Sequence, residues 1–143
     1  MNIQIRAMMV EDLEQVIDFW NSIEGIGGID GETPEALSYY LDRNRGMSFV
    51  ALDGDTLIGA VLSGHDGRRG YINHLAVAKS YRGQDIGKEL VECCLRELES
   101  IGIPKCHIFV YQDNEAAQAF WERVGWVERS ELLLMSKNMS RNR

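Results

Sequence analysis

The hydrophobic pattern of the chain changes its period at one point, between Val77 and Ile86. Residues 71–77 are mostly apolar and strand-like, whereas from Ile86 on the apolar residues recur every three or four positions, as on one face of a helix. Gly102 and Pro104 end that helix, and 106–111 is again strand-like. A strand, a crossover helix and a second strand form a unit that makes one parallel strand pair.

The segments on either side predict a complete order of elements, β-α-α-β-β-β-α-β-α-β(β). Expected strands are 2–6, 47–52, 56–63, 71–77, 106–111, 127–129 and 132–136, and expected helices are 13–23, 34–41, 86–101 and 114–124. The sequence Asp53-Gly54-Asp55 is a hairpin signal, which makes the middle strands antiparallel. We therefore expect an α/β (α+β) fold with a mixed, mostly antiparallel sheet of six to seven strands and helices on both faces.

Length and composition limit the classes of protein to which this chain can belong. The 143 residues suit one domain, 1–143, and no apolar run approaches the ~20 residues of a membrane helix. A net charge of −7 disfavours nucleic-acid binding, which depends on phosphate neutralisation. The N-terminus has no signal-like apolar segment, and the three cysteines have no metal-ligand spacing. We expect a cytoplasmic protein with reduced cysteines, no metal and no membrane partner.

The turn before the long helix has features of an anion site. A helix start presents unpaired N–H groups and a partial positive charge, and glycine lets an anion approach the backbone. Gly83 provides that access, and Arg82 and Lys88 add positive charge on either side. These features fit a phosphate-binding loop, and an ordinary strand-to-helix connection fits them equally well.

Two motifs in this chain resemble those of the GNAT superfamily of acyl-CoA-dependent N-acyltransferases. The first is Leu75-Ala76-Val77 followed by Arg82-Gly83-Gln84-Asp85-Ile86-Gly87, similar to the family's Arg/Gln-x-x-Gly-x-Gly/Ala after a strand. The second, 114–126, contains Asn114-Glu115-Ala116-Ala117 and Phe120-Trp121-Glu122-Arg123-Val124-Gly125-Trp126. The order of elements is also similar, so the resemblance spans nearly the whole chain.

The resemblance implies roles in holding acetyl-CoA as a co-substrate. Backbone groups of Leu75, Ala76 and Val77 would bind the pantetheine arm as an added strand does. The N–H groups of the turn and first helical residues would hold the pyrophosphate; these residues are Arg82, Gly83, Gln84, Asp85, Ile86, Gly87 and Lys88. Asn114 would contact the pantetheine or cap its helix, and Trp121 completes the expected cofactor-binding set. The strands of Val77 and Phe109 are expected to splay apart around the thioester.

The chain departs from the family pattern at Asp85, which stands where the motif usually has glycine. A carboxylate ~5 Å from the pyrophosphate costs roughly 3 kcal/mol at an effective dielectric of ~20, before solvent and cations offset it. Asp85 could also cap the helix and occupy the N–H groups that the phosphates need. Alternatively the side chain turns outward to water and costs little.

The catalytic residues are less defined. Trp121 stands where the family often has a tyrosine that protonates the thiolate, so Tyr111 is a candidate substitute, with packing as the alternative. His74 is the candidate general base, with a structural histidine as the alternative. Strand alternation predicts that His74 and Ala76 share one face of the sheet, and Asn73 and Leu75 the other. The resemblance also implies that the loop of residues 24–32 lies on the side of the acceptor amine. Its three acidic residues could bind a cationic substrate or relay a proton, or they could be solvated charges: Glu24, Asp30 and Glu32.

The expected function is transfer of an acetyl group from acetyl-CoA to a primary amine of a small molecule or a peptide, by direct attack in a ternary complex. A non-catalytic acyl-CoA-binding or regulatory module of the same fold is the alternative. An unrelated nucleotide-binding domain fits less well, because no G-x-x-x-x-G-K-[ST] motif is present. A homodimer is compatible with such folds, although no patch in the sequence identifies an interface.

Overall fold

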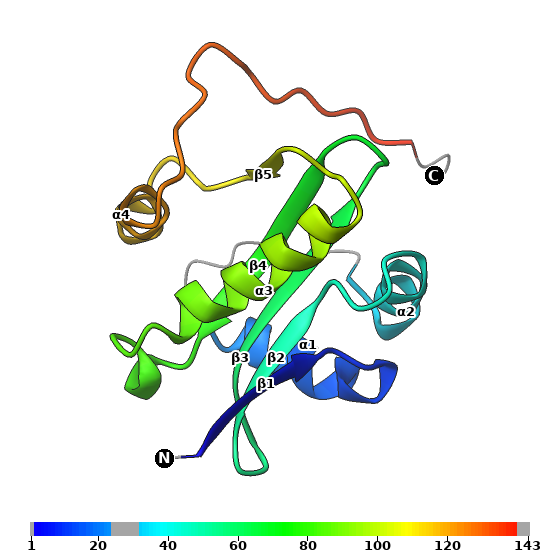
Figure 1. Cartoon of the computed structure of the whole chain (residues 1–143), viewed down its shortest axis with the longest axis vertical. Coiled ribbons are helices and arrows are strands. Elements are labelled where there is room, and N and C mark those ends of the chain that lie inside the picture. The colour runs from blue at the N-terminus through cyan, green and yellow to red at the C-terminus, as the bar shows by residue number, and fades with distance from the viewer. Residues whose placement is uncertain (1, 24–31, 140–143) are drawn as a thin grey trace.

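The computed structural model describes residues 2–23 and 32–139, and its centre is one five-stranded sheet (Figure 1). The strands, in both spatial and chain order, are β1 (Ile3–Ala7), β2 (Phe49–Asp53), β3 (Thr56–His65), β4 (Gly70–Val77) and β5 (Cys106–Ile108). β1 to β4 pair antiparallel, and β4 and β5 pair parallel. The predicted mixed, mostly antiparallel sheet is confirmed.

Helices cover both faces of the sheet, as expected. They are α1 (Leu13–Asn21), α2 (Pro34–Arg43), α3 (Ile86–Ser100) and α4 (Glu115–Arg123), with short 3₁₀ turns at Val10–Asp12 and Lys79–Tyr81. α2 begins where Thr33 accepts a 3.1 Å hydrogen bond from the backbone N–H of Ala36, and Pro34 fills the first helical position. None of the helices within the described ranges is long and apolar enough to cross a membrane.

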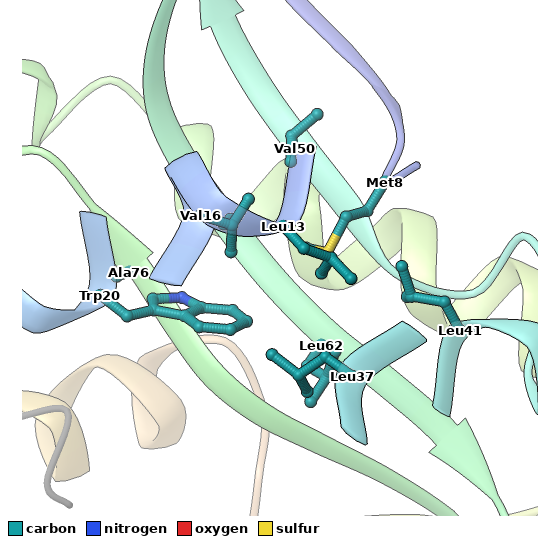
Figure 2. Close-up of a cluster of buried hydrophobic side chains, with 10 residues drawn as sticks. Met8, Leu13, Val16, Trp20, Leu37, Leu41, Val50, Leu62 and Ala76 are labelled. Atoms are coloured by element: carbon teal, nitrogen blue, oxygen red, sulfur yellow. The ribbon is translucent and has the colours of Figure 1, made fainter. Parts of the chain in front are cut away.

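Two hydrophobic cores lie on opposite faces of the sheet. Figure 2 shows the core beneath α1 and α2, where Val16 and Trp20 of α1 lie over Leu62 of β3 and Ala76 of β4. The second core lies beneath α3 and contains residues of β2, β3, β4, α3 and α4: Ala51, Ile58, Val61, Ile72, Ile86, Leu90, Val91, Cys94 and Trp121. Because both faces are buried, the central strand β3 is apolar along almost its whole length.

The sheet is smaller than the six to seven strands predicted. Residues 127–129 and 132–136 were expected to be strands, but the described chain after α4 is irregular up to residue 139. β5 is also shorter than the predicted 106–111. A strand exists only where a neighbour takes its backbone hydrogen bonds, and β5 has a single neighbour, β4. The prediction of the last strands was therefore wrong for the single chain.

Candidate functional site

The pairing of β4 with β5 stops partway along β4, because β5 ends at Ile108. Their parallel ladder ends where Ile72 pairs with Ile108, whereas β4 continues for five more residues to Val77. Residues 73–77 therefore have no β5 partner, and in this part of the described sheet one edge of β4 is free for another extended group. Because β5 ends at Ile108, before Phe109, the expected splaying of two strands that carry Val77 and Phe109 stays a prediction.

The free part of β4 begins with a β-bulge. His74 and Leu75 together oppose a single residue of β3, Val61. His74 has a φ of 56°, in the left-handed region that few non-glycine residues adopt. Such a bulge bends the strand and redirects a side chain, which is how bulges contribute to functional sites.

The bulge changes which side chains share a face. Asn73 pairs with Leu62, whose side chain lies in the core beneath α1 and α2, and directly paired residues point to the same face. His74 and Ala76 lie on that same side, whereas Leu75 packs into the core beneath α3. The prediction that Asn73 and Leu75 share a face was wrong, because the extra residue interrupts the alternation.

His74 is held between an aromatic ring and a carboxylate. Its imidazole lies against the indole of Trp20, with ring centroids 5.0 Å apart and planes inclined by 54°. Its Nε2 is 3.6 Å from Oε2 of Glu32, just before α2. The side chain of His74 is 17% exposed and that of Glu32 is 28% exposed. Glu24 and Asp30, the other acidic candidates, lie outside the described residues.

The surroundings of His74 determine its protonation. Burial lowers the pKa of His74 below its ordinary value, and the carboxylate of Glu32 opposes that shift without cancelling it. A buried imidazole with a lowered pKa is neutral near pH 7 and has a nitrogen that can accept a proton. The arrangement suits a general base.

The N-terminus of α3 lies beyond the end of β4. Gly83 has a φ of 83° and Asp85 a φ of 65°, so the turn contains two left-handed residues. The side chain of Asp85 is exposed and makes no capping hydrogen bond. Of the two alternatives for Asp85, capping of the helix in competition with a phosphate is therefore not observed, and the exposed, outward orientation is.

Arg82 connects this turn to the free part of β4. Its Nε donates a 2.9 Å hydrogen bond to the backbone carbonyl of Val77. A Cβ atom added to Gly87 would lie 3.5 Å from the ring of Phe120 on α4 and 3.6 Å from the side chain of Val77. The end of β4, the start of α3 and one face of α4 therefore come together around Gly87.

Asn114 caps α4. Its side-chain oxygen accepts a 3.0 Å hydrogen bond from the N–H of Ala117. The capping interpretation is therefore confirmed, and a contact of Asn114 with a cofactor stays a prediction. Trp121 is only 9% exposed and packs edge-on against Trp126, with ring centroids 4.9 Å apart. Its role in cofactor binding also stays a prediction.

Tyr111 lies in the loop between β5 and α4 and is 58% exposed. Its backbone carbonyl accepts hydrogen bonds from the N–H of Asn114 and from Nε2 of Gln118, which tie the loop to α4. In the part of the chain that the structure describes, no hydrogen bond or ring contact joins Tyr111 to His74. The structure thus brings His74 and Glu32 together and leaves Tyr111 apart from them.

The three cysteines are free thiols. Burial raises the pKa of Cys94 to about 12 and that of Cys106 to about 11. Both are protonated at neutral pH and are poor nucleophiles, because the thiolate is the reactive form. No group of three or more potential metal ligands occurs within the described ranges.

Comparisons with known proteins agree with this arrangement. A model of the "Acetyltransferase (GNAT) family" matches residues 13–126. N-alpha-acetyltransferase 30 of Schizosaccharomyces pombe is 40% identical over 93 residues, which are 62% of each chain, less than two thirds of that relative. An acetyltransferase of Yersinia pestis is 28% identical over 137 residues, 95% of each chain.

A solved structure has a similar fold. AAC(6')-Iy, in complex with the bisubstrate analogue CoA-S-monomethyl-acetylneamine, superposes with a TM-score of 0.78 at 17% identity. The superposition covers 96% of this chain and 99% of that one. At this level of identity the likeness concerns the fold alone.

Proposed function

This chain belongs to the acetyltransferase (GNAT) family, and from that premise we propose that it transfers an acetyl group from acetyl-CoA to a primary amine of a small molecule or a peptide. Both kinds of acceptor occur in the names of structures with a similar fold: the NatC complex bound to a Gag peptide and CoA, and AAC(6')-Iy in complex with an analogue that joins CoA to acetylneamine. The proposal includes a cytoplasmic location, in keeping with three free cysteines.

One observation carries the proposal: the free edge of β4 leads to a helix N-terminus that no side chain caps. Residues 73–77 have no β5 partner and would offer backbone groups on that edge to an extended pantetheine arm, centred on Leu75, Ala76 and Val77; the carbonyl of Val77 already accepts a hydrogen bond from Nε of Arg82. The turn of 82–85 and the first residues of α3 offer N–H groups to a pyrophosphate. These features fit acetyl-CoA, whose thioester supplies the activated acetyl group.

The remaining cofactor contacts are proposed on the same basis. The backbone of Gly83, Gln84, Ile86 and Gly87 would face the phosphates, with Arg82 and Lys88 as flanking cations. A Cβ on Gly87 would meet Phe120 and Val77 only at ordinary contact distances, so a reason for glycine here would be the close approach of a phosphate to the backbone. Asn114 and Trp121, at the start and in the last turns of α4, would border the pantetheine.

His74 is the proposed base. An amine acceptor arrives as an ammonium ion and must lose a proton before its nitrogen can attack a carbonyl carbon. In neutral His74 the nitrogen that faces Glu32, Nε2, carries the hydrogen, so the proton would be taken at Nδ1, and Glu32 would stabilise the imidazolium that results. Tyr111 is the candidate for the opposite step, donating a proton to the departing thiolate from the loop after β5.

The experiment that tests this proposal is a CoA-release assay across amino acids, polyamines, aminoglycosides and peptide N-termini, alongside calorimetry of acetyl-CoA binding. We expect acetyl-CoA binding and release of CoA with at least one class of amine. Binding with no release against any acceptor would favour the alternative, a non-catalytic acyl-CoA-binding module. Absence of binding would contradict both.

A matched pair of variants makes the assay specific. Val77→Ala keeps the backbone, so binding through backbone groups should survive, whereas Val77→Pro removes an N–H from the free part of β4 and should weaken acetyl-CoA binding. Equal affinity of the two variants would contradict pantetheine binding along β4. Tyr111→Phe should lower the rate without changing acetyl-CoA affinity if Tyr111 donates the proton.

A further inference from the structure

Positive charge gathers at the end of the sheet where β3 turns into β4 and where β5 begins (Figure 1). Arg68 and Arg69 lie in that turn, and Lys105 directly precedes β5. Arg43, at the end of α2, is held beside the turn because its Nη1 donates a 2.7 Å hydrogen bond to the backbone carbonyl of His65. We call the one lysine and the three arginines the basic end; Arg69 is half-buried and the other three are exposed.

The basic end is not neutralised by ion pairs. In the part of the chain that the structure describes, none of its four side chains pairs with a carboxylate. Asp66, in the same turn, accepts hydrogen bonds from the backbone N–H groups of Arg68 and Arg69. Glu131, near Lys105, pairs with Arg129 at 2.7 Å. Positive charge is therefore in excess here, although the whole chain has a net charge of −7, and such a surface favours an anionic ligand.

Aromatic rings continue this surface along β4 and β5. Ile72 and Ile108 pair with each other and pack beneath α3, so their neighbours in the two strands point to the opposite face. Between ring centroids, Tyr71 lies 5.7 Å from His107 and 6.3 Å from Phe109. The rings of Tyr71 and Phe109 are nearly parallel, and Phe109 is 59% exposed. We call these three neighbours the aromatic strip, a surface on which an apolar or peptide group can pack.

The aromatic strip leads to the proposed base. It lies on the side of the sheet that carries α1 and α2, but the core beneath these helices includes no residue of β5 and, within the described ranges, only Ala76 of β4. Asn73 points to the same side and is followed by His74, whose Nε2 faces Glu32. One face of β4 therefore runs from the basic end, over the aromatic strip, to the proposed base.

The length of this face limits what can span it. Arg69 and His74 are five positions apart, and a strand rises about 3.3 Å per residue, so the two lie roughly 16 Å apart along β4. A single amino acid is too short to touch both ends. An extended peptide whose terminal amine lies at His74 has the same rise, and brings about its fourth to sixth residues to the basic end.

We infer that the acceptor is the N-terminus of an acidic peptide, with its amine at His74 and Glu32, its first residues on the aromatic strip and the carboxylates of about its fourth to sixth residues at the basic end. The inference rests on the proposed acetyl transfer. In that reaction the amine nitrogen bonds to the acetyl carbon, the carbon–sulfur bond breaks, the amine proton goes to His74 and CoA leaves as a thiolate.

The test compares two amidated hexapeptides that share their first three residues. One has glutamate and the other glutamine at positions four to six. Calorimetry in the presence of CoA measures peptide binding, and CoA release from acetyl-CoA measures transfer. Since one exposed charge contact changes affinity by up to about fivefold, we expect the glutamate peptide to bind at least about fivefold better and to react with a correspondingly lower KM. Added salt should reduce the difference.

A matched pair of charge reversals locates the effect. Arg69→Glu should abolish the preference for the glutamate peptide and should favour a third peptide with lysine at the same positions. Arg96→Glu is the control, because it changes the net charge equally at an exposed position of α3, on the opposite face of the sheet, and should keep the preference. Phe109→Ala should raise KM for the glutamate and glutamine peptides by similar factors. Far-UV circular dichroism checks that each variant is folded.

The outcomes separate this inference from the proposed function. Equal binding and equal kcat/KM for the glutamate and glutamine peptides would overturn the inference and leave acetyl transfer intact. So would a preference that survives in Arg69→Glu, a preference that is lost equally in Arg96→Glu, or transfer to small amines alone. Preferential binding of the glutamate peptide without CoA release would contradict the proposed transfer and, with it, the role of the peptide as acceptor.

Discussion

The Nε2 atom of His74 lies 3.6 Å from a carboxylate oxygen of Glu32, although the two residues are separated by more than forty positions in the chain. The bulge in β4 turns the imidazole toward α1 and α2, and Glu32 sits immediately before Thr33, the cap of α2. The bulge and the helix start together place a base and a carboxylate beside the free edge of β4.

Glu32→Gln should shift the pH dependence of the reaction. Glu32 raises the pKa of His74 against the larger lowering effect of burial, so removing its charge should lower that pKa further. The acidic limb of the rate profile, where His74 becomes protonated and inactive, should therefore move to lower pH. The measurement is kcat/KM against pH, with Glu35→Gln, an exposed residue of α2, as the control. If the acidic limb does not move in Glu32→Gln, the charge of Glu32 does not set the pKa of the catalytic base.

His74→Asn should slow acetyl transfer by roughly 10²–10⁴-fold, the usual contribution of a general base. Asparagine tolerates left-handed backbone, so the bulge at φ 56° should persist and acetyl-CoA affinity should not change. Without the base the ammonium group must lose its proton to solvent, so the remaining rate should rise with pH toward the pKa of the acceptor amine, about 10 for a primary amine. If the rate and its pH profile match those of the unmodified chain, His74 is a structural histidine.

The same pKa predicts how stability depends on pH. Because the pKa of His74 is lower in the folded chain than in the unfolded chain, the unfolded chain binds the proton more readily. The stabilisation is fully present above the unfolded pKa of about 6.5 and is lost as the pH falls through the lower, folded value. Urea unfolding of the unmodified chain and of His74→Asn between pH 5 and pH 8 should show that the variant loses less stability in acid.

The order of elements up to α4 could be predicted from the sequence, because local signals mark their ends. Thr33-Pro34 begins α2, Asp53-Gly54-Asp55 forms the hairpin of β2 and β3, and Gly102 ends α3 with a φ of 86°. The two motifs around β4, α3 and α4 indicated the family for the same reason: their residues lie close together along the chain.

Two features depend on partners distant in sequence and were not predictable in this way. The bulge has no glycine or proline to mark it, and only the pairing of β4 with β3 defines it. The contact of His74 with Trp20 and Glu32 follows from the bulge. The predicted last strands, 127–129 and 132–136, would need a neighbouring strand to take their backbone hydrogen bonds, and in the described chain no strand pairs with them.

Asp85→Gly should tighten acetyl-CoA binding. The variant removes a negative charge near the start of α3 and relieves a left-handed conformation that glycine adopts freely. Since Asp85 is exposed, solvent weakens its repulsion of the phosphates; exposed charge contacts contribute about 1 kcal/mol or less, so the gain is up to about fivefold in affinity. Asp85→Asn separates the causes, since it removes the charge and keeps the conformation. Calorimetry that finds no gain in either variant would exclude repulsion by Asp85.

Gly64→Ala and Gly87→Ala should change the free energy of unfolding in opposite directions. A Cβ on Gly64, buried in β3, would collide with the hydroxyl of Tyr40 and the amide of Asn44, which itself accepts a hydrogen bond from the N–H of His65. Overpacking of this kind costs roughly 1–3 kcal/mol.

Gly87 is the matched control for this collision, because its added Cβ would meet Phe120 and Val77 at ordinary contact distances of 3.5 and 3.6 Å. Alanine is also the better helix former, so Gly87→Ala should stabilise the chain without CoA by about 0.5–1 kcal/mol. The same methyl group would occupy space next to the proposed phosphate site and should weaken acetyl-CoA binding. Denaturant unfolding and calorimetry on both variants measure the two effects separately. A variant at Gly87 that gains stability and keeps full affinity would mean that the phosphates do not approach α3 at this residue.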